Sequence, residues 1–128
     1  MKQNIGALLL RVVLGVILIG HGVGKFQDGI GNIAGWFDSI GLPGFLAYIV
    51  ASIELVGGIA MLLGLATRIV GGLFVLVLLG AIVTVQFSAG FIGGYAYDLA
   101  LLAMSAYFLL NGSTSYSIDQ YLSKLKSK

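Results

Sequence analysis

Cysteine is absent from this chain of 128 residues, and histidine, tryptophan and proline each occur once. Without cysteine, the chain has no disulfide, no thiolate metal ligand and no Cys-ligated iron–sulfur cluster. A single histidine also excludes bis-histidine haem ligation within one chain. We therefore expect no haem or iron–sulfur site in one copy of the protein.

Charged residues are also scarce: they make up only 9% of the chain, whereas about 25% is usual in soluble domains. Hydrophobic residues make up 59% of the chain, and the mean hydropathy is +1.05. This composition predicts an integral membrane protein. The length allows about four spans of ~20 residues and leaves no room for a separate soluble catalytic domain. Chemistry must then occur within the spans, at their faces, or with a partner protein.

Apolar runs cover about residues 5–23, 45–65, 69–87 and 91–110, each near the length that a helix needs to cross a bilayer. They predict an all-α fold, a four-helix bundle that forms one domain over residues 1–128, with a C-terminal tail at 111–128. The short link after residue 63 predicts that the second and third spans are antiparallel neighbours. A cleaved signal peptide is the rival interpretation of the N-terminus, but no small-x-small site follows and Arg11 interrupts the apolar run.

The connection between the first two spans is rich in glycine and too polar to cross the membrane. Its apolar side chains recur at steps of three or four residues, at Ile30, Ile33, Trp36, Phe37 and Ile40. This spacing predicts a short amphipathic helix in the membrane interface, with Trp36 at headgroup depth, followed by a turn at residues 41–43. Asn111 and Gly112 are predicted to stop the last span, and Ser117 to cap a short terminal helix.

Basic residues are distributed unequally between the two predicted sides of the membrane. One side has Lys25 beside Asp28 and Asp38. The other carries Lys2, Arg68, Lys124, Lys126 and Lys128. The positive-inside rule therefore predicts a multi-pass protein of the cell membrane with both termini in the cytoplasm. The basic tail is interpreted as a topology signal and not as a nucleic-acid site.

Ionisable residues also occur inside the apolar runs, at Arg11, His21, Glu54 and Asp98. A charge at the bilayer centre costs about 2.5 kcal/mol or more, so intramembrane charges are functional candidates. At about 100° per residue, Arg11, His21 and Lys25 share one face of the first span. Rises of ~1.5 Å per residue place Arg11 about 10 Å, Glu54 about 15 Å, Asp98 about 18 Å and His21 about 25 Å from the inner side.

These depths predict a core network of Arg11, Glu54 and Asp98, in which the long side chain of Arg11 reaches Glu54. The network is expected to open outward toward His21, Lys25 and the interfacial segment with Trp36. Because the core set has one positive and two negative charges, one of the two acids is a candidate to be protonated, or to pair with His21 or Lys25. A structural role is the alternative, because buried ion pairs in small bundles can simply set helix register.

Small and polar residues share the faces of these charges and predict a bundle with a polar interior. They are Ala47, Ala51, Gly57 and Gly58 in the second span, Gly80, Thr84 and Ser88 in the third, and Gly94 and Ser105 in the fourth. Such residues let helix backbones approach closely in membranes. Gly20 and Gly24, four residues apart, are likewise expected to pack closely.

The chain resembles the DoxX family of small four-span bacterial membrane proteins nearly from end to end. The matching pieces are LLLRVVLGVILIGHGVGKF, GLPGFLAYIVASIELVGGIAMLLGLATR and SIDQYL. Two places depart from the family pattern: Asp98 stands where glutamate is more usual, and NGSTSY replaces a Gly-Pro-Gly type of turn.

The resemblance implies an association with oxidoreductase activity. The family includes proteins similar to the membrane subunit of thiosulfate:quinone oxidoreductases, and others linked to catechol or quinone detoxification and oxidative stress. The polar pocket would then bind a quinone or a similar small redox molecule, with Arg11 or His21 donating to a carbonyl oxygen, Glu54 and Asp98 exchanging protons, and Lys25 and Trp36 at the mouth.

Electrons would come from elsewhere, through a flavin on a soluble oxidoreductase partner or through the quinone itself as the redox group. The alternative is a non-catalytic membrane scaffold or a pathway for a small solute, which recruits such a partner. The sequence also leaves open a homo-oligomer and a purely structural role.

Overall fold

The computed structural model describes residues 2–112 and 117–126, and these residues form α-helices without any strand. Residues 113–116, within the unusual NGSTSY segment, lie outside the described part. The helices are α1 (Lys2–Gln27), α2 (Ile30–Ser39), α3 (Phe45–Leu63), α4 (Thr67–Ala81), α5 (Ala96–Asn111) and α6 (Ile118–Lys126). The predicted all-α class is confirmed.

Four helical segments are long and apolar enough to cross a membrane: Ile5–Gln27, Phe45–Leu63, Thr67–Ala89 and Phe91–Asn111. They agree with the predicted spans to within a few residues, so the number and order of the spans are confirmed. Large apolar side chains such as Val16, Val56, Leu76 and Leu110 are more than half exposed. This outer surface is suited to lipid and not to water.

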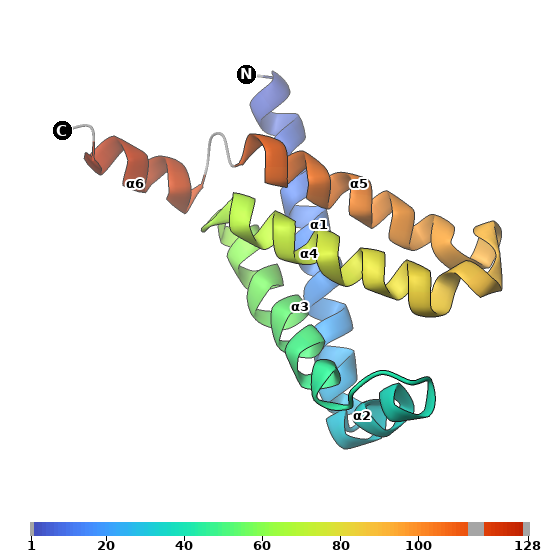
Figure 1. The fold of residues 1–128 in the computed structure, drawn as a ribbon. Coiled ribbons are helices and arrows are strands. Elements are labelled where there is room, and N and C mark those ends of the chain that lie inside the picture. Colours follow the sequence, from blue (N-terminus) through green and yellow to red (C-terminus); the bar gives the residue numbers. More distant parts are fainter. Residues whose placement is uncertain (1, 113–116, 127–128) are drawn as a thin grey trace.

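The spans are arranged as two pairs, because α1 packs mainly on α3 and α4 mainly on α5. Figure 1 shows that the two pairs cross, and that α3 and α4 diverge from the turn that joins them. Phe74 of α4 lies against Gly57 of α3, so these helices are neighbours near the turn. The two helices are thus neighbours as predicted, and they diverge beyond the turn because a short link constrains only the helix ends that it joins.

Glycines bring the backbones of α1 and α3 into direct contact. A Cβ atom on Gly15 would lie 2.9 Å from the carbonyl oxygen of Gly58, and one on Gly22 would lie 2.7 Å from the backbone nitrogen of Leu55. Gly20 and Gly24 would meet no atom within 4 Å. The close approach predicted for that pair is wrong within this chain, because α3 lies against the neighbouring stripe of α1.

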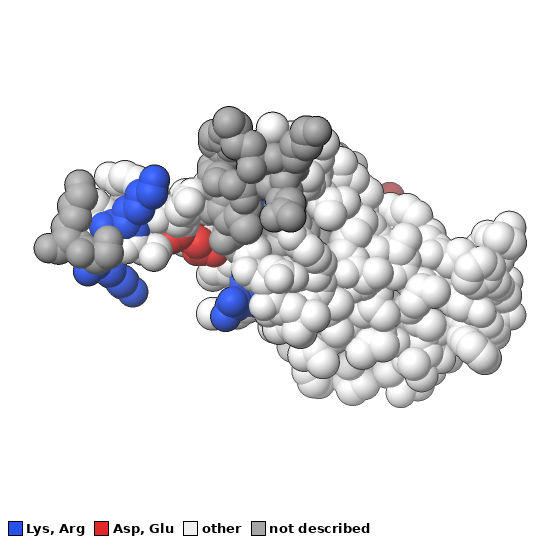
Figure 2. Space-filling view, turned by 90° about the horizontal axis from the view of Figure 1, so that it is seen from above, with Lys and Arg blue, Asp and Glu red and all other residues white. Residues whose placement is uncertain are grey.

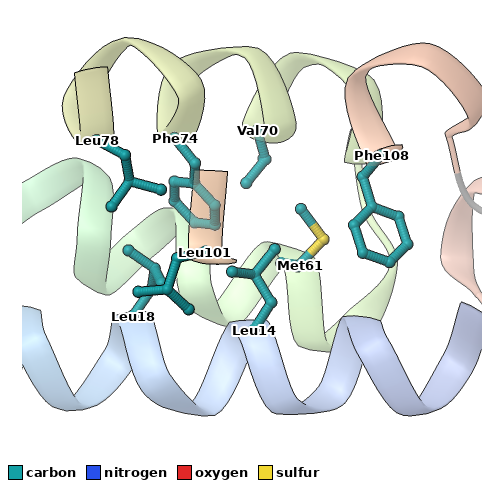
Figure 3. Packing of buried hydrophobic residues seen from close by; sticks show 8 residues of the cluster. All are labelled: Leu14, Leu18, Met61, Val70, Phe74, Leu78, Leu101 and Phe108. Atoms are coloured by element: carbon teal, nitrogen blue, oxygen red, sulfur yellow. The ribbon is translucent and has the colours of Figure 1, made fainter. Parts of the chain in front are cut away.

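The centre of the protein is apolar and draws on all four spans (Figure 3). Its buried side chains are Leu14, Leu18, Met61, Val70, Phe74, Leu78, Leu101 and Phe108. The prediction of a polar interior is wrong for the third span, where Gly80, Thr84 and Ser88 are exposed. The hydroxyl of Thr84 donates to the carbonyl oxygen of Gly80 at 2.6 Å, so the helix itself satisfies this polar group.

The connection between the third and fourth spans is irregular and aromatic. A π-helical turn at Ile82–Gln86 and a 3₁₀ turn at Phe87–Ala89 precede a kinked segment at Phe91–Tyr95. The ring of Tyr95 stacks on Phe87 with centroids 5.6 Å apart and meets Phe91 edge-on at 5.1 Å. This segment reverses the chain so that α5 returns along α4.

The shorter helices also match their sequence signals. The predicted amphipathic segment is helical as α2, with Phe37 buried and Trp36 exposed, while its place in the membrane interface stays a prediction. Helix α5 ends at Asn111, followed by Gly112 with a φ of 69°. The backbone nitrogen of Gln120 donates to the Ser117 hydroxyl oxygen at 3.1 Å, which confirms the predicted cap of α6.

Candidate functional site

The ionisable residues inside the spans lie in two separate groups, each of which includes neighbouring residues. We call the first the histidine cluster, which consists of His21, Lys25, Glu54, Tyr97 and Asp98. The second, the arginine cluster, consists of Arg11, Gly64, Thr67 and Asp119. The apolar core lies between them, because Leu14 and Leu18 occupy the stretch of α1 between Arg11 and His21 and are fully buried.

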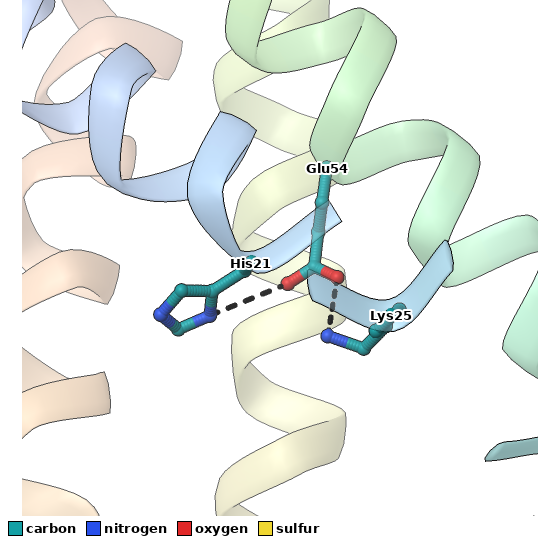
Figure 4. A network of polar contacts seen from close by, with 3 residues as sticks. All are labelled: His21, Lys25 and Glu54. Atoms are coloured by element: carbon teal, nitrogen blue, oxygen red, sulfur yellow. Dashed lines mark hydrogen bonds and ion pairs between the residues drawn. The ribbon is translucent and has the colours of Figure 1, made fainter. Parts of the chain in front are cut away.

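Glu54 is the centre of the histidine cluster (Figure 4). The ammonium group of Lys25 donates to its Oε1 atom at 2.6 Å, and the Nδ1 atom of His21 lies 3.7 Å from Oε2. Only 4% of the Glu54 side chain is exposed, against 38% for His21 and 23% for Lys25. A buried carboxylate is thus connected to the exterior through two side chains that can donate hydrogen bonds.

Local sequence explains how these groups meet. His21 and Lys25 are four residues apart and so share a face of α1. Gly22, on the same face, lets α1 lie directly on α3 beside Leu55, next to Glu54. The cluster therefore depends on a small residue that carries no polar group itself.

Helix α5 completes the cluster with Asp98 and Tyr97. Asp98 lies in the first turn of α5, is 8% exposed, and is close enough for the charges of His21, Glu54 and Lys25 to act on its carboxyl group. The ring of Tyr97 stacks on the imidazole of His21, with centroids 5.9 Å apart and planes at 25°. Sequence reasoning did not select Tyr97, although its position beside a charged span residue was a usable signal.

Arg11 lies in the arginine cluster, away from Glu54. It is 2% exposed, and its Nη1 atom is 2.9 Å from the place that a Cβ atom on Gly64 would occupy. Gly64 directly follows α3 and is ten residues beyond Glu54, or about 15 Å along the helix axis. The structure therefore does not join Arg11, Glu54 and Asp98 into one network. Trp36 is exposed on α2, with its ring edge-on to Phe37.

Asp119 organises the arginine cluster from the far end of the chain. Its carboxylate accepts hydrogen bonds from the backbone nitrogens of Ala66 at 2.7 Å and Thr67 at 2.9 Å. Its own backbone nitrogen donates to the carbonyl oxygen of Gly64 at 2.9 Å, and its charge acts on Arg11. Ala66 is the N-cap residue of α4, and Asp119 thus provides the capping side chain that normally belongs to the N-cap residue itself.

A shallow groove of about 470 Å³ lies beside the arginine cluster. It is lined by Ala66, Thr67, Arg68, Ile69, Asn111, Gly112 and Asp119. Within the described ranges, no three His, Asp or Glu side chains are placed so that they could hold a metal ion. The groove and the histidine cluster are at opposite ends of the apolar core.

Comparison of the sequence with known proteins identifies relatives of this chain. The family model described as DoxX matches residues 6–87, a range that holds Arg11, His21, Lys25 and Glu54. The chain belongs to the DoxX family. The predicted family is thereby confirmed, and with it the expectation of a membrane protein.

Among DoxX relatives, the chain is 50% identical over 123 residues to a Bacillus subtilis (strain 168) protein named "Putative oxidoreductase CatD", with 96% of this chain and 91% of that protein covered. It is 32% identical over 134 residues to "Uncharacterized membrane protein Rv3486" of Mycobacterium tuberculosis, covering 91% of this chain and 81% of that protein. "Inner membrane protein YqjF" of Escherichia coli (strain K12) is 32% identical over 129 residues, with 95% of each chain covered. No solved structure gives a significant match.

Proposed function

We propose that the histidine cluster binds a quinone or a similar small redox molecule, in quinone or catechol detoxification or in the response to oxidative stress. The observation that carries the proposal is the buried carboxylate of Glu54, bonded to Lys25 at 2.6 Å and near His21, whose side chain is 38% exposed. A buried acid behind two partly exposed donors suits a ligand that accepts hydrogen bonds and then takes up protons.

The chemistry of a quinone fits the groups of the cluster. Each carbonyl oxygen accepts hydrogen bonds, which His21 and Lys25 can donate. The stacked rings of His21 and Tyr97 offer a flat aromatic surface beside these donors. Reduction of a quinone to a hydroquinone takes two electrons and two protons, so Glu54 and Asp98 are proposed as the groups that exchange protons with the bound ring.

Electrons must reach the quinone from another molecule. A soluble oxidoreductase with a bound flavin is the partner class that meets this need, and the quinone is then the redox group that the membrane chain itself holds. The name of the Bacillus subtilis relative, "Putative oxidoreductase CatD", agrees with a link to redox chemistry. Arg11, placed in the arginine cluster, is assigned no contact with the ring.

Quinone titration of the purified protein tests the proposal through the fluorescence of Trp36, the sole tryptophan. We expect saturable quenching that is lost in Glu54→Gln and weakened in His21→Leu. The matched control is Asp28→Asn, which removes an exposed acid just beyond α1. Quenching that does not saturate, or that is equal in Glu54→Gln and the wild type, would refute quinone binding at this cluster.

A non-catalytic scaffold is the second candidate function, and the ion pair of Lys25 and Glu54 is also consistent with it. Lys25 and Glu54 already satisfy each other at 2.6 Å, as expected of a pair that fixes helix register. In that case the chain recruits a soluble oxidoreductase or forms a pathway for a small solute. Membranes that contain Glu54→Gln at the same level of folded protein as the wild type would then keep the oxidoreductase activity, whereas membranes without the chain would lose it. Quinone binding predicts loss in both.

The proposed orientation has both termini in the cytoplasm. Since the chain has no cysteine, single cysteines report topology without interference. With a membrane-impermeant maleimide, Ser39→Cys should react in intact cells, and Ser123→Cys only after the membrane is opened. The reverse pattern would place the termini outside.

A further inference from the structure

Among the described residues, the first turn of helix α6 is bonded to the turn between α3 and α4. Asp119 provides the attachment through its bonds to Gly64, Ala66 and Thr67. Beyond that turn, residues 121–126 are exposed, and Figure 1 shows α6 extending away from the four spans. A helix of nine residues has little stability alone in water, so its outer face needs a surrounding that stabilises it.

The side chains of α6 are divided into two faces. At about 100° per residue, its apolar side chains fall within an arc of about 100°. They are Ile118, Tyr121, Leu122 and Leu125. Lys124 and Lys126 lie about 90–110° to either side of the centre of this stripe. Lysines that flank an apolar stripe are typical of helices lying in the membrane interface, where the stems reach along the apolar layer and the ammonium groups reach the headgroups.

The attachment places α6 at the level of the membrane surface. Helix α3 ends at Leu63 and α4 begins at Thr67, so the turn between them marks the end of two spans. Asp119 is bonded to this turn. The first turn of α6 is therefore held where headgroups begin, and a helix starting there can lie along the surface with Leu122 and Leu125 in the boundary with the acyl chains.

Charge selects the kind of lipid. In Figure 2, basic side chains gather on α6 and near its root, with acidic atoms between them, while most of the described surface in that view is uncharged. Arg68 belongs to the root: it lines the groove beside Asp119, and its Nε atom is 3.1 Å from the place of a Cβ atom on Gly112. We infer that α6 and Arg68 form a binding surface for anionic phospholipids, with the phosphates against Lys124, Lys126 and Arg68.

The test uses the full chain in nanodiscs of mixed phosphatidylglycerol and phosphatidylcholine. Tyr121→Trp, made in a Trp36→Phe background, provides one fluorophore on the apolar stripe of α6. Brominated acyl chains, which quench tryptophan on contact, are placed on one lipid or on the other while the composition stays constant. We expect stronger quenching from brominated phosphatidylglycerol, with a preference that declines as salt is added.

Variants of the two lysines link this preference to charge. Lys124→Gln with Lys126→Gln should reduce the preference for phosphatidylglycerol, by about fivefold per lysine if each contributes as basic residues near anionic membranes do. The matched control, Lys124→Arg with Lys126→Arg, keeps the charge and should keep the preference. Equal quenching by both lipids would overturn the inference, and so would the absence of quenching, which would place α6 in water or against a protein.

Discussion

Close contact between α1 and α3 predicts opposite effects for two glycines that are two residues apart. In Gly22→Ala, the new Cβ atom would lie 2.7 Å from the backbone nitrogen and 2.9 Å from the Cβ atom of Leu55. In Gly20→Ala, it would meet no atom within 4 Å. Both positions lie inside the same helix, so they differ in their surroundings and not in helix propensity.

The expected magnitudes follow from this difference. Alanine in place of a helical glycine stabilises by about 0.5–1 kcal/mol, so Gly20→Ala should raise the free energy of unfolding by up to that amount. Ordinary carbon contacts are about 3.5–4.0 Å, so Gly22→Ala must separate the helices by several tenths of an ångström or more. Overpacking of this kind costs about 1–3 kcal/mol. The two variants should therefore differ by about 1.5–4 kcal/mol.

Reversible unfolding of the purified protein in mixed micelles measures both variants under one condition. In membranes, helix association depends on packing more than on the hydrophobic effect. The poorer packing in Gly22→Ala should therefore appear as a lower free energy of unfolding. The histidine cluster gives a second readout, because displacement of α1 from α3 also separates Lys25 from Glu54. Equal stability of Gly20→Ala and Gly22→Ala would refute the close contact and the account of the site built on it.

Three further predictions concern the two clusters. Asp119→Ala removes the cap of α4 and should lower the free energy of unfolding by about 0.5–2 kcal/mol, with a smaller loss in Asp119→Asn. No loss in thermal unfolding would show that α6 does not hold the turn. Lys25→Met removes the ammonium group that donates to the buried Glu54 at 2.6 Å, and should lower the free energy of unfolding by about 1–3 kcal/mol. The double variant Lys25→Met with Glu54→Gln should recover most of this loss in the same assay. Gly64 has a φ of 73°, and a Cβ atom there would meet Ser117 and Arg11, whereas Gly41 has a φ of 89° and open space around it. Gly64→Ala should therefore destabilise more than Gly41→Ala in thermal unfolding, and similar losses would mean that only the backbone angle matters.

Periodicity and length were sufficient to predict the spans. Runs of apolar residues determine how many helices cross a membrane, and Asn111 with Gly112 and Ser117 marked helix ends through local chemistry alone. The buried faces of α1 and α3 were also predictable, because Glu54, Gly57 and Gly58 share one stripe and are all buried. These features depend on neighbours in sequence.

Partner choice was not predictable in the same way. Depth along the membrane allowed Arg11 to reach Glu54, but depth does not say which helices touch or how pairs cross. In the structure Lys25 bonds to Glu54, and Asp119, 55 residues beyond Gly64 in the sequence, acts on Arg11. The stripe of Thr84 and Ser88 shows the same limit, since each hydroxyl donates to a carbonyl oxygen of its own helix instead of a neighbouring one.

The position of Asp119 also has a consequence for biosynthesis. Arg11 is in the first span to leave the ribosome, whereas the carboxylate that acts on it arrives roughly 100 residues later, about 5–20 s at common rates of translation. A ribosome that stops before Asp119 would release four complete spans that lack both the cap of α4 and the carboxylate whose charge acts on Arg11.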